Sequence, residues 1–348
     1  MALLIGMDEA GLGPNFGPFV VAATVWEVPD SETGFDFWTA FDTILTREPV
    51  AGDPRLHIAD SKQVFQPQKG LDALERGVWG ALSLLGWGPM SFGGLCRQLA
   101  PRYTKASSRA GSKTTSAKAR RGSLFEDCEL SAARSPTDTH PIDKDQVCLP
   151  WYENDLPLPL TSLDLKLAEP WQRRCEQLGA RLVSVHAEIV EPLRFNRLVR
   201  RYDNKAQATS RLAMNLLRAI WDPDAGPALI VADKHGGRNR YDMLLSDTFG
   251  QPVECLEEGA EISIYQLGRG ELRFQPRAEE HGPVALASMA AKYLREVAMH
   301  QFNRFWQARI PGLKPTQGYP NDARRFREEI SAEQRRLRIV EDLIWRER

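Results

Sequence analysis

The chain of 348 residues has a formal net charge of −1 at neutral pH, so its overall charge gives no general attraction to polyanions. Its 42% hydrophobic and 9% aromatic residues are typical of a globular protein with a hydrophobic core. It has no apolar run long enough to span a membrane and no signal-peptide pattern. The five cysteines form no Cys-x-x-Cys pair, which argues against structural zinc and a disulfide framework and favours the reducing cytoplasm.

Two short apolar runs, residues 3–7 and 19–26, predict buried strands that follow one another closely. We expect Asp8 to end the first strand and Glu9 to open the turn, so that the two carboxylates lie side by side. Carboxylates this close repel each other unless a cation lies between them, which indicates a metal site. A simple polar turn is the alternative. A dinucleotide-binding loop is disfavoured because the glycine-rich turn leads into a strand and not into a helix.

The spacing of apolar residues predicts further elements along the chain. Some segments have apolar residues three and four positions apart, which is the spacing of a helix. Between them are short segments that are either wholly apolar or alternate apolar with polar residues, which is typical of strands. The predicted helices are 67–85, 204–221, 283–306 and 323–348, and the predicted strands are 181–190, 228–233, 253–255, 262–267 and 271–274.

Residues 102–145 differ in composition from the rest of the chain. Their first part is rich in Lys, Arg, Ser and Thr and has no acidic residue, and large apolar residues are rare throughout. Such a segment buries too little apolar surface to offset its ordering entropy, which predicts a disordered insertion. It is either a basic arm that contacts a phosphate backbone or a solvated linker.

Acidic residues follow two predicted strands and precede a predicted helix. Asp8 and Glu9 follow the first strand, Asp233 ends the strand 228–233, and Glu279 lies before the helix 283–306. In an α/β protein such strand ends form the functional site. Four carboxylates without His or Cys partners suit Mg²⁺ or Mn²⁺, and two such ions about 4 Å apart can activate water against a phosphodiester.

Six motifs in the same order resemble those of ribonuclease HII, the type 2 ribonucleases H. The match runs from the first strand to the start of the last predicted helix, and it is interrupted by the insertion. The fourth acid is similar to the Glu of the ribonuclease HIII branch. The motifs are GMDEAGLGPNFGP at 6–18, DSK at 60–62, AD at 232–233, RAE at 277–279, ASMAAKYLRE at 287–296 and GYPND at 318–322.

The resemblance implies a ribonuclease H-like α/β fold, with a central mixed five-stranded sheet flanked by helices. It implies one catalytic domain over residues 1–348, with 307–348 as a C-terminal helical extension, acting as a monomer. The implied activity is metal-dependent cleavage of RNA in RNA–DNA hybrids or RNA-containing DNA, which leaves 3′-hydroxyl and 5′-phosphate ends. Asp8, Glu9, Asp233 and Glu279 would hold two Mg²⁺ or Mn²⁺ ions.

The resemblance also implies how the substrate is recognised. The backbone of Gly11, Leu12 and Gly13 would approach the ribose 2′-hydroxyl, which distinguishes RNA from DNA. Lys62 would face the phosphate backbone, and Tyr319 would stack on a sugar at the scissile junction.

Three features depart from the family pattern. Leu12 replaces the usual Arg of a Gly-Arg-Gly loop, which removes a charged phosphate contact. The segment after Glu279 is one residue shorter than expected, so Glu280 is an alternative fourth ligand. Residues 234–238, KHGGR, match no motif and are interpreted as a basic substrate-facing loop or a helix lead-in.

Two other functions remain compatible with the sequence. A non-catalytic relative would bind nucleic acid through the basic insertion, with scattered acids. Another nuclease of the same fold would use the same metal site to cut branched DNA.

Overall fold

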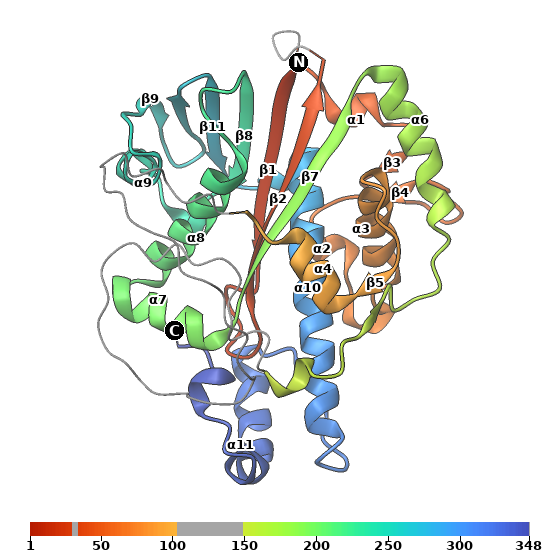
Figure 1. Ribbon diagram of the computed structural model, residues 1–348, viewed down its shortest axis with the longest axis vertical. Coiled ribbons are helices and arrows are strands. Elements are labelled where there is room, and N and C mark those ends of the chain that lie inside the picture. Colours follow the sequence, from red (N-terminus) through yellow and green to blue (C-terminus); the bar gives the residue numbers. More distant parts are fainter. Residues whose placement is uncertain (30–33, 103–148, 348) are drawn as a thin grey trace, which may run out of the picture.

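The computed structural model describes residues 1–29, 34–102 and 149–347 (Figure 1). Apart from Arg102, the insertion predicted at 102–145 lies outside these residues. In the described part of the chain, no helix is both long and apolar enough to cross a membrane.

A seven-stranded mixed sheet forms the centre of the molecule. Strand β1 (Ala2–Ala10) pairs antiparallel with β2 (Phe19–Val28) and parallel with β8 (Ala228–Asp233), and β8 pairs parallel with β11 (Gly270–Gln275). The mixed α/β architecture is confirmed, but the five-stranded sheet is not, because β10 and β9 add two antiparallel strands beyond β11. In spatial order the strands are β7 (Arg181–Val190), β2 (Phe19–Val28), β1 (Ala2–Ala10), β8 (Ala228–Asp233), β11 (Gly270–Gln275), β10 (Ser263–Leu267) and β9 (Glu254–Glu258).

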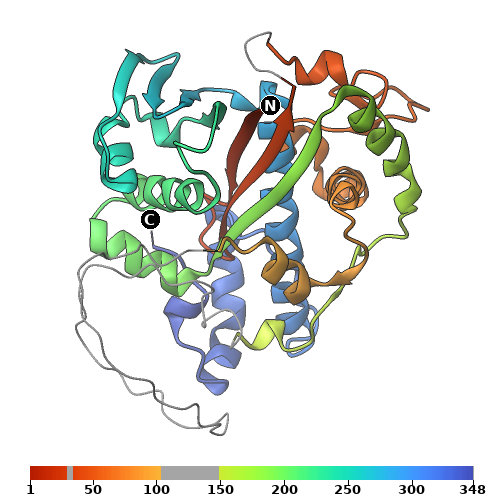
Figure 2. The ribbon, with the colours of Figure 1, turned by 45° about the horizontal axis from the view of Figure 1, so that its top comes forward.

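Helices cover both faces of the sheet, as Figures 1 and 2 show from two directions. Helix α10 (Gly282–Gln307) lies along β1 and β2 with α3 (Asp72–Leu84) beside it. Helix α8 (Lys205–Ile220) and α7 (Pro192–Tyr202) pack on the other face. Alternate residues of β1 therefore enter different cores: Leu4 packs toward α10, whereas Ile5 belongs to the core beneath α8.

Shorter elements connect these layers. They are α1 (Phe37–Ala40), β3 (Leu45–Thr46), β4 (Leu56–His57), α2 (Ser61–Val64), η2 (Pro67–Lys69), β5 (Met90–Ser91), α4 (Phe92–Leu99), η3 (Pro150–Tyr152), β6 (Pro157–Leu158), η4 (Leu165–Ala168), α6 (Glu169–Leu178), η5 (His235–Gly237), α9 (Asp242–Phe249), η6 (Ala278–Glu280), α11 (Pro320–Arg336) and η7 (Glu341–Leu343).

Two predicted helices have different bounds in the structure. The helix predicted at 67–85 is divided into η2 and α3, because Gly70 between them has a φ of 71°. The helix predicted at 323–348 begins at Pro320 and ends at Arg336, and Arg338 then has a left-handed φ of 54°. The chain after α11 is therefore free to fold back along the molecule.

A third core joins the last part of α10 to α11 and to the loop after β1. Phe16 lies at its centre, with ring centroids 5.5 Å from those of Phe302 and Phe326. Trp345 packs edge-on against Phe16 at 5.2 Å. This aromatic core therefore fixes the glycine-rich loop and the segment after α11 against each other.

Candidate metal centre and substrate loop

Asp8 and Glu9 lie inside β1, not at its end. The strand continues to Ala10, and Asp8 and Glu9 pair with Ala22 and Val21 of β2. The prediction that Glu9 opens a turn is therefore wrong. Because successive side chains on a strand alternate, Asp8 points toward α10, whereas Glu9 points toward the opposite face.

Three of the four predicted acids come together at one edge of the sheet. Asp8 on β1, Asp233 at the end of β8 and Glu279 on η6 place carboxylate oxygens within 4.8 Å of one another. The parallel strands β1, β8 and β11 run in the same direction, so the segments at their carboxyl ends meet there. Glu279, and not Glu280, belongs to this cluster; Glu280 is exposed and its carbonyl accepts from Trp38 Nε1 at 2.6 Å.

Burial and mutual repulsion make this cluster electrostatically unfavourable. Burial, together with the nearby charge of Glu279, raises the pKa of Asp8 to about 7, although a hydrogen bond from Ser288 opposes the shift. Burial and the charge of Asp8 raise the pKa of Glu9 to about 8. Burial also raises the pKa of Asp233 and of Glu279. Crowded carboxylate oxygens of this kind fit a hard divalent cation such as Mg²⁺ or Mn²⁺.

Glu9 has a partner that the sequence did not predict. Its Oε2 lies 3.6 Å from Nε2 of His235, which is buried, and burial lowers the pKa of that imidazole to about 4. Gly236 and Gly237 both have positive φ and turn the chain sharply after His235. The segment 234–238 therefore contributes a neutral imidazole next to Glu9. Its only local signal is a His two residues after Asp233, followed by two glycines.

The Asp60-Ser61-Lys62 motif forms the N-terminus of α2. The Asp60 carboxylate caps the helix by accepting from the Lys62 backbone N–H at 3.0 Å. Ser61 is buried, with its Oγ 3.0 Å from the Oγ of Ser288, the residue that bonds to Asp8. Lys62 is exposed, and its Nζ lies 3.9 Å from Glu279 Oε1. Through Ser61 the motif contacts Ser288, which bonds to Asp8. Through Lys62 it places a positive charge at the exposed edge of the acid cluster, next to Glu279.

The glycine-rich loop follows β1 directly. Gly11 has a φ of 90°, and a Cβ there would lie 2.7 Å from the Pro18 carbonyl oxygen and 2.8 Å from Arg295 Cδ, so only glycine fits. The half-buried side chain of Leu12 packs against the core beneath α8. A Cβ on Gly13 would be 3.8 Å from the Tyr319 ring, which places that ring beside the loop.

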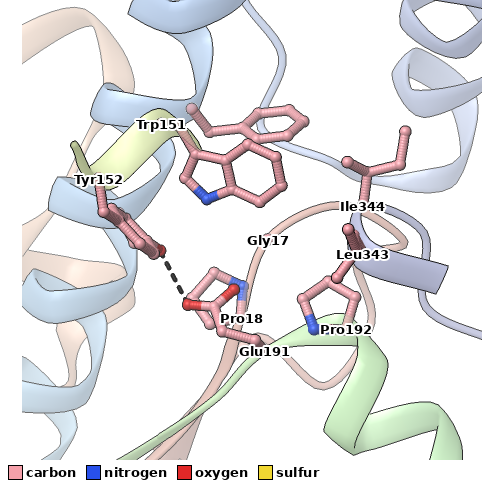
Figure 3. A pocket seen from close by; sticks show the side chains of 10 residues that line it. Gly17, Pro18, Trp151, Tyr152, Glu191, Pro192, Leu343 and Ile344 are labelled. Carbon is pink, nitrogen blue, oxygen red and sulfur yellow. Dashed lines mark hydrogen bonds between the residues drawn. The ribbon is translucent and has the colours of Figure 1, made fainter. Parts of the chain in front are cut away.

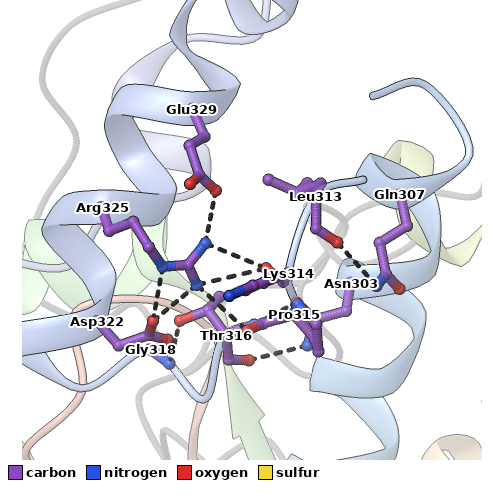
Figure 4. A network of polar contacts seen from close by, with 10 residues as sticks. All are labelled: Asn303, Gln307, Leu313, Lys314, Pro315, Thr316, Gly318, Asp322, Arg325 and Glu329. Atoms are coloured by element: carbon purple, nitrogen blue, oxygen red, sulfur yellow. Dashed lines mark hydrogen bonds and ion pairs between the residues drawn. The ribbon is translucent and has the colours of Figure 1, made fainter. Parts of the chain in front are cut away.

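A polar network connects the residues on both sides of Tyr319 (Figure 4). Tyr319 precedes α11 and is 47% exposed. Arg325 donates to Asp322 Oδ1 at 2.7 Å and to the carbonyls of the preceding loop. Asn303 of α10 bonds both ways with the Thr316 backbone, at 2.8 and 2.9 Å. The turn that carries the exposed Tyr319 ring is therefore held by hydrogen bonds on both sides, from Asn303 and from Arg325.

Comparison with known proteins finds matches among solved structures only. No protein-family model and no curated protein matches the chain. Similar structures include the ribonuclease H2 from Pyrococcus horikoshii OT3, with a TM-score of 0.45 and 12% identity over 98% of this chain and 92% of that one. The RNase HII of a PCNA complex from Archaeoglobus fulgidus has a TM-score of 0.38 and 12% identity over 99% and 94%. Bst-RNase HIII in complex with Mn²⁺ has a TM-score of 0.37 and 16% identity over 99% and 66%.

We predict that Asp8→Asn stabilises the metal-free protein, and more so at pH 8 than at pH 5. The pKa of Asp8 is raised, so the native state binds that proton more tightly than the unfolded chain does. This contribution to stability is complete below about pH 4 and is lost as the pH rises through about 7. At pH 8 the variant should gain about 1–3 kcal/mol in free energy of unfolding.

The measurement is urea unfolding in EDTA at both pH values. The matched control is Asp247→Asn, which removes an exposed carboxylate paired with Arg211 and should follow the wild type. If Asp8→Asn were no more stable at pH 8 than the wild type, the crowding of the acids would not be the unfavourable interaction described here.

Proposed function

We propose that this protein is a divalent-metal-dependent endoribonuclease that hydrolyses the RNA strand of RNA–DNA hybrids, within a single catalytic domain. The observation that supports this most strongly is the convergence of Asp8, Asp233 and Glu279 beside a glycine-rich loop. Asp8 is buried, and Asp233 and Glu279 are half-buried, so three crowded carboxylates serve no packing purpose. Charge that is removed from water without a partner destabilises a fold.

Each acid has a role in this proposal. Asp8, Asp233 and Glu279 would hold Mg²⁺ or Mn²⁺. Glu9, the fourth predicted ligand, lies outside this cluster beside His235, but its charge interacts with those of Asp8 and Asp233, so it would contribute from the edge of the site. The bound ions would lower the pKa of the attacking water and stabilise the leaving 3′-oxygen, giving 3′-hydroxyl and 5′-phosphate products. Lys62 at the rim would attract the phosphate backbone and offset part of the negative charge of the cluster.

The substrate class follows from the loop next to the acids. Reading a ribose requires close approach of the backbone, and Gly11 and Gly13 carry no Cβ to prevent it. The ring of Tyr319, beside Gly13, offers an exposed face on which a sugar can stack. A nuclease for branched DNA would need no such ribose-reading loop, and a purely binding protein would need no converged acid cluster.

We predict that Asp8→Asn and Asp233→Asn each reduce hybrid cleavage by at least about a hundredfold, because each replaces a charged metal ligand with a neutral amide. The assay uses four labelled duplexes, RNA–DNA hybrid, DNA, RNA and DNA with one ribonucleotide, together with a labelled branched DNA, in Mg²⁺ or Mn²⁺. Asp247→Asn again serves as the control and should keep wild-type rates. Cleavage of branched DNA but not of the hybrid would favour the other nuclease, and activity of Asp8→Asn within tenfold of wild type would contradict the site.

We also predict that hybrids with several consecutive ribonucleotides are cut faster than DNA with one embedded ribonucleotide. The Leu12 side chain packs into the core and offers no phosphate contact, whereas an Arg would supply a fork of donors. Such a contact is worth about 1.5–3 kcal/mol, or roughly ten- to a hundredfold. Leu12→Arg should narrow the difference, measured as the ratio of single-turnover rates. Equal rates on both substrates in the wild type would rule out Leu12 as the determinant.

A further inference from the structure

Arg346 reaches the glycine-rich loop from the far end of the sequence. Its side chain is 1% exposed, and its Nη2 donates to the carbonyl oxygens of Gly11 and Pro14, the latter at 2.5 Å. These two carbonyls lie on either side of Leu12 and Gly13. One guanidinium thus holds both ends of the short segment that the proposed function assigns to ribose recognition.

The backbone around Arg346 is docked independently of its side chain. Arg346 N donates to the Asn15 carbonyl at 2.7 Å, and Asn15 Nδ2 donates to the Arg346 carbonyl at 3.0 Å. Phe16 and Trp345 form an antiparallel bridge beside this pair. A substitution of the Arg346 side chain should therefore leave the segment in place.

The neighbouring residues of this segment pack against the rest of the loop and against α7. Leu343 and Ile344 line a pocket with Gly17, Pro18 and Trp151, which Figure 3 shows from close by. Asn196 of α7 donates to the Trp345 carbonyl at 2.9 Å. The segment 341–347 is therefore held on two sides before the guanidinium makes any contact.

The peptide between Gly11 and Leu12 is oriented by the hydrogen bond from the Arg346 guanidinium to its carbonyl oxygen. In a trans peptide the N–H and the C=O point in opposite directions. Because the Gly11 carbonyl points inward to Arg346, the N–H of Leu12 in the same peptide points away from it. Among the described residues no acceptor is found for this N–H, so it is available to a ligand. The Asn15 N–H, by contrast, is already bonded to the Gly318 carbonyl at 2.7 Å.

Arg346 makes a poor contribution to the stability of the fold. Its Nε and Nη1 are buried and have no acceptor among the described residues. Its guanidinium lies over the Phe195 ring at 4.9 Å, and burial together with the nearby charge of Arg295 lowers its pKa to about 9. A buried cation with unused donors costs stability, so packing alone does not account for an arginine here.

We propose that Arg346 is a positioning residue for RNA recognition, which holds the Gly11 and Pro14 carbonyls inward so that the Leu12 N–H is directed at the ribose 2′-hydroxyl. This inference rests on the proposed function, since it names the residue that orients the ribose-reading loop. The family pattern places an arginine inside the loop, and here Leu12 occupies that position. Arg346, from the end of the chain, instead holds the loop through the carbonyls of Gly11 and Pro14.

The test compares Arg346→Met and Arg346→Lys with the wild type. Methionine keeps the length and packing without the donors, and lysine keeps the charge without the planar fork. The main readout is the ratio of the dissociation constants for a DNA duplex and for an RNA–DNA hybrid of the same sequence. Binding is measured by fluorescence anisotropy in Ca²⁺ on ice, with intact substrate verified on gels. We expect the ratio to fall about tenfold in Arg346→Met and less in Arg346→Lys, while DNA affinity stays within about twofold.

Arg200→Met is the matched control. Arg200 anchors the same segment through exposed bonds to Asp342, at 2.8 and 2.9 Å, and does not contact the loop. It should keep the wild-type ratio. A ratio for Arg346→Met within twofold of wild type, in a folded protein, would overturn the inference, as would an equal loss in Arg200→Met. If Arg346→Met does not fold, the same comparison is made with Arg346→Lys.

A second readout separates this inference from the proposed function. Hydrogen exchange of peptides covering residues 11–16, without nucleic acid, reports the positioning of the loop directly. Exchange should be faster in Arg346→Met than in Arg200→Met, and equal exchange would show that Arg346 does not hold the loop. A wild type that neither cleaves hybrids nor prefers them to DNA would reject the proposed function, whatever the exchange shows.

Discussion

Repulsion among crowded carboxylates, of which Asp8 is buried and the others are half-buried, is the constraint on which the site depends. Parallel strands bring Asp8 and Asp233 to the same edge of the sheet, and η6 adds Glu279. The groups around them each moderate this repulsion locally: Ser288 bonds to Asp8, and Lys62 lies at the rim. None of them neutralises the cluster, so in the free protein packing elsewhere in the fold must hold the carboxylates together.

Close packing of α10 on β1 supplies that support. A Cβ at Gly6 would lie 2.2 Å from the Pro283 carbonyl carbon, and Thr24 Oγ1 donates to the Pro283 carbonyl oxygen at 2.8 Å. This contact fixes the register of the helix against the strand, which sets Ser288 next to Asp8. Two turns further along, the same helix places Arg295 against Gly11. One helix thus positions both the acid cluster and the glycine-rich loop.

The parts of the fold that have local sequence signals were predictable. The bounds of β7 and β8 agree with the alternation and the apolar run that predicted them, and the acid at the end of β8 lies where it was expected. The end of the first strand could not be read from the sequence, because the glycines after Glu9 look the same whether the strand ends at Asp8, as predicted, or at Ala10, as observed. The contact of Arg346 with Gly11 spans 335 residues and has no local pattern at all. The sequence could not decide between Glu279 and Glu280 as the fourth acid. They are adjacent in the short helix η6, and only its conformation shows that Glu279 faces the acid cluster.

The free protein carries unfavourable charge of both signs around one loop. Asp8, Glu9, Asp233 and Glu279 crowd negative charge before Gly11, whereas Arg295 and Arg346 bury positive charge behind it, close enough to lower the pKa of Arg346. A divalent cation would relieve the first group, and a bound polynucleotide would add negative charge near the second. Because the side chains are fixed before binding, little reorganisation is needed when these partners arrive. The instability of the site in the free state is thus the physical counterpart of the preorganisation that the proposed function requires.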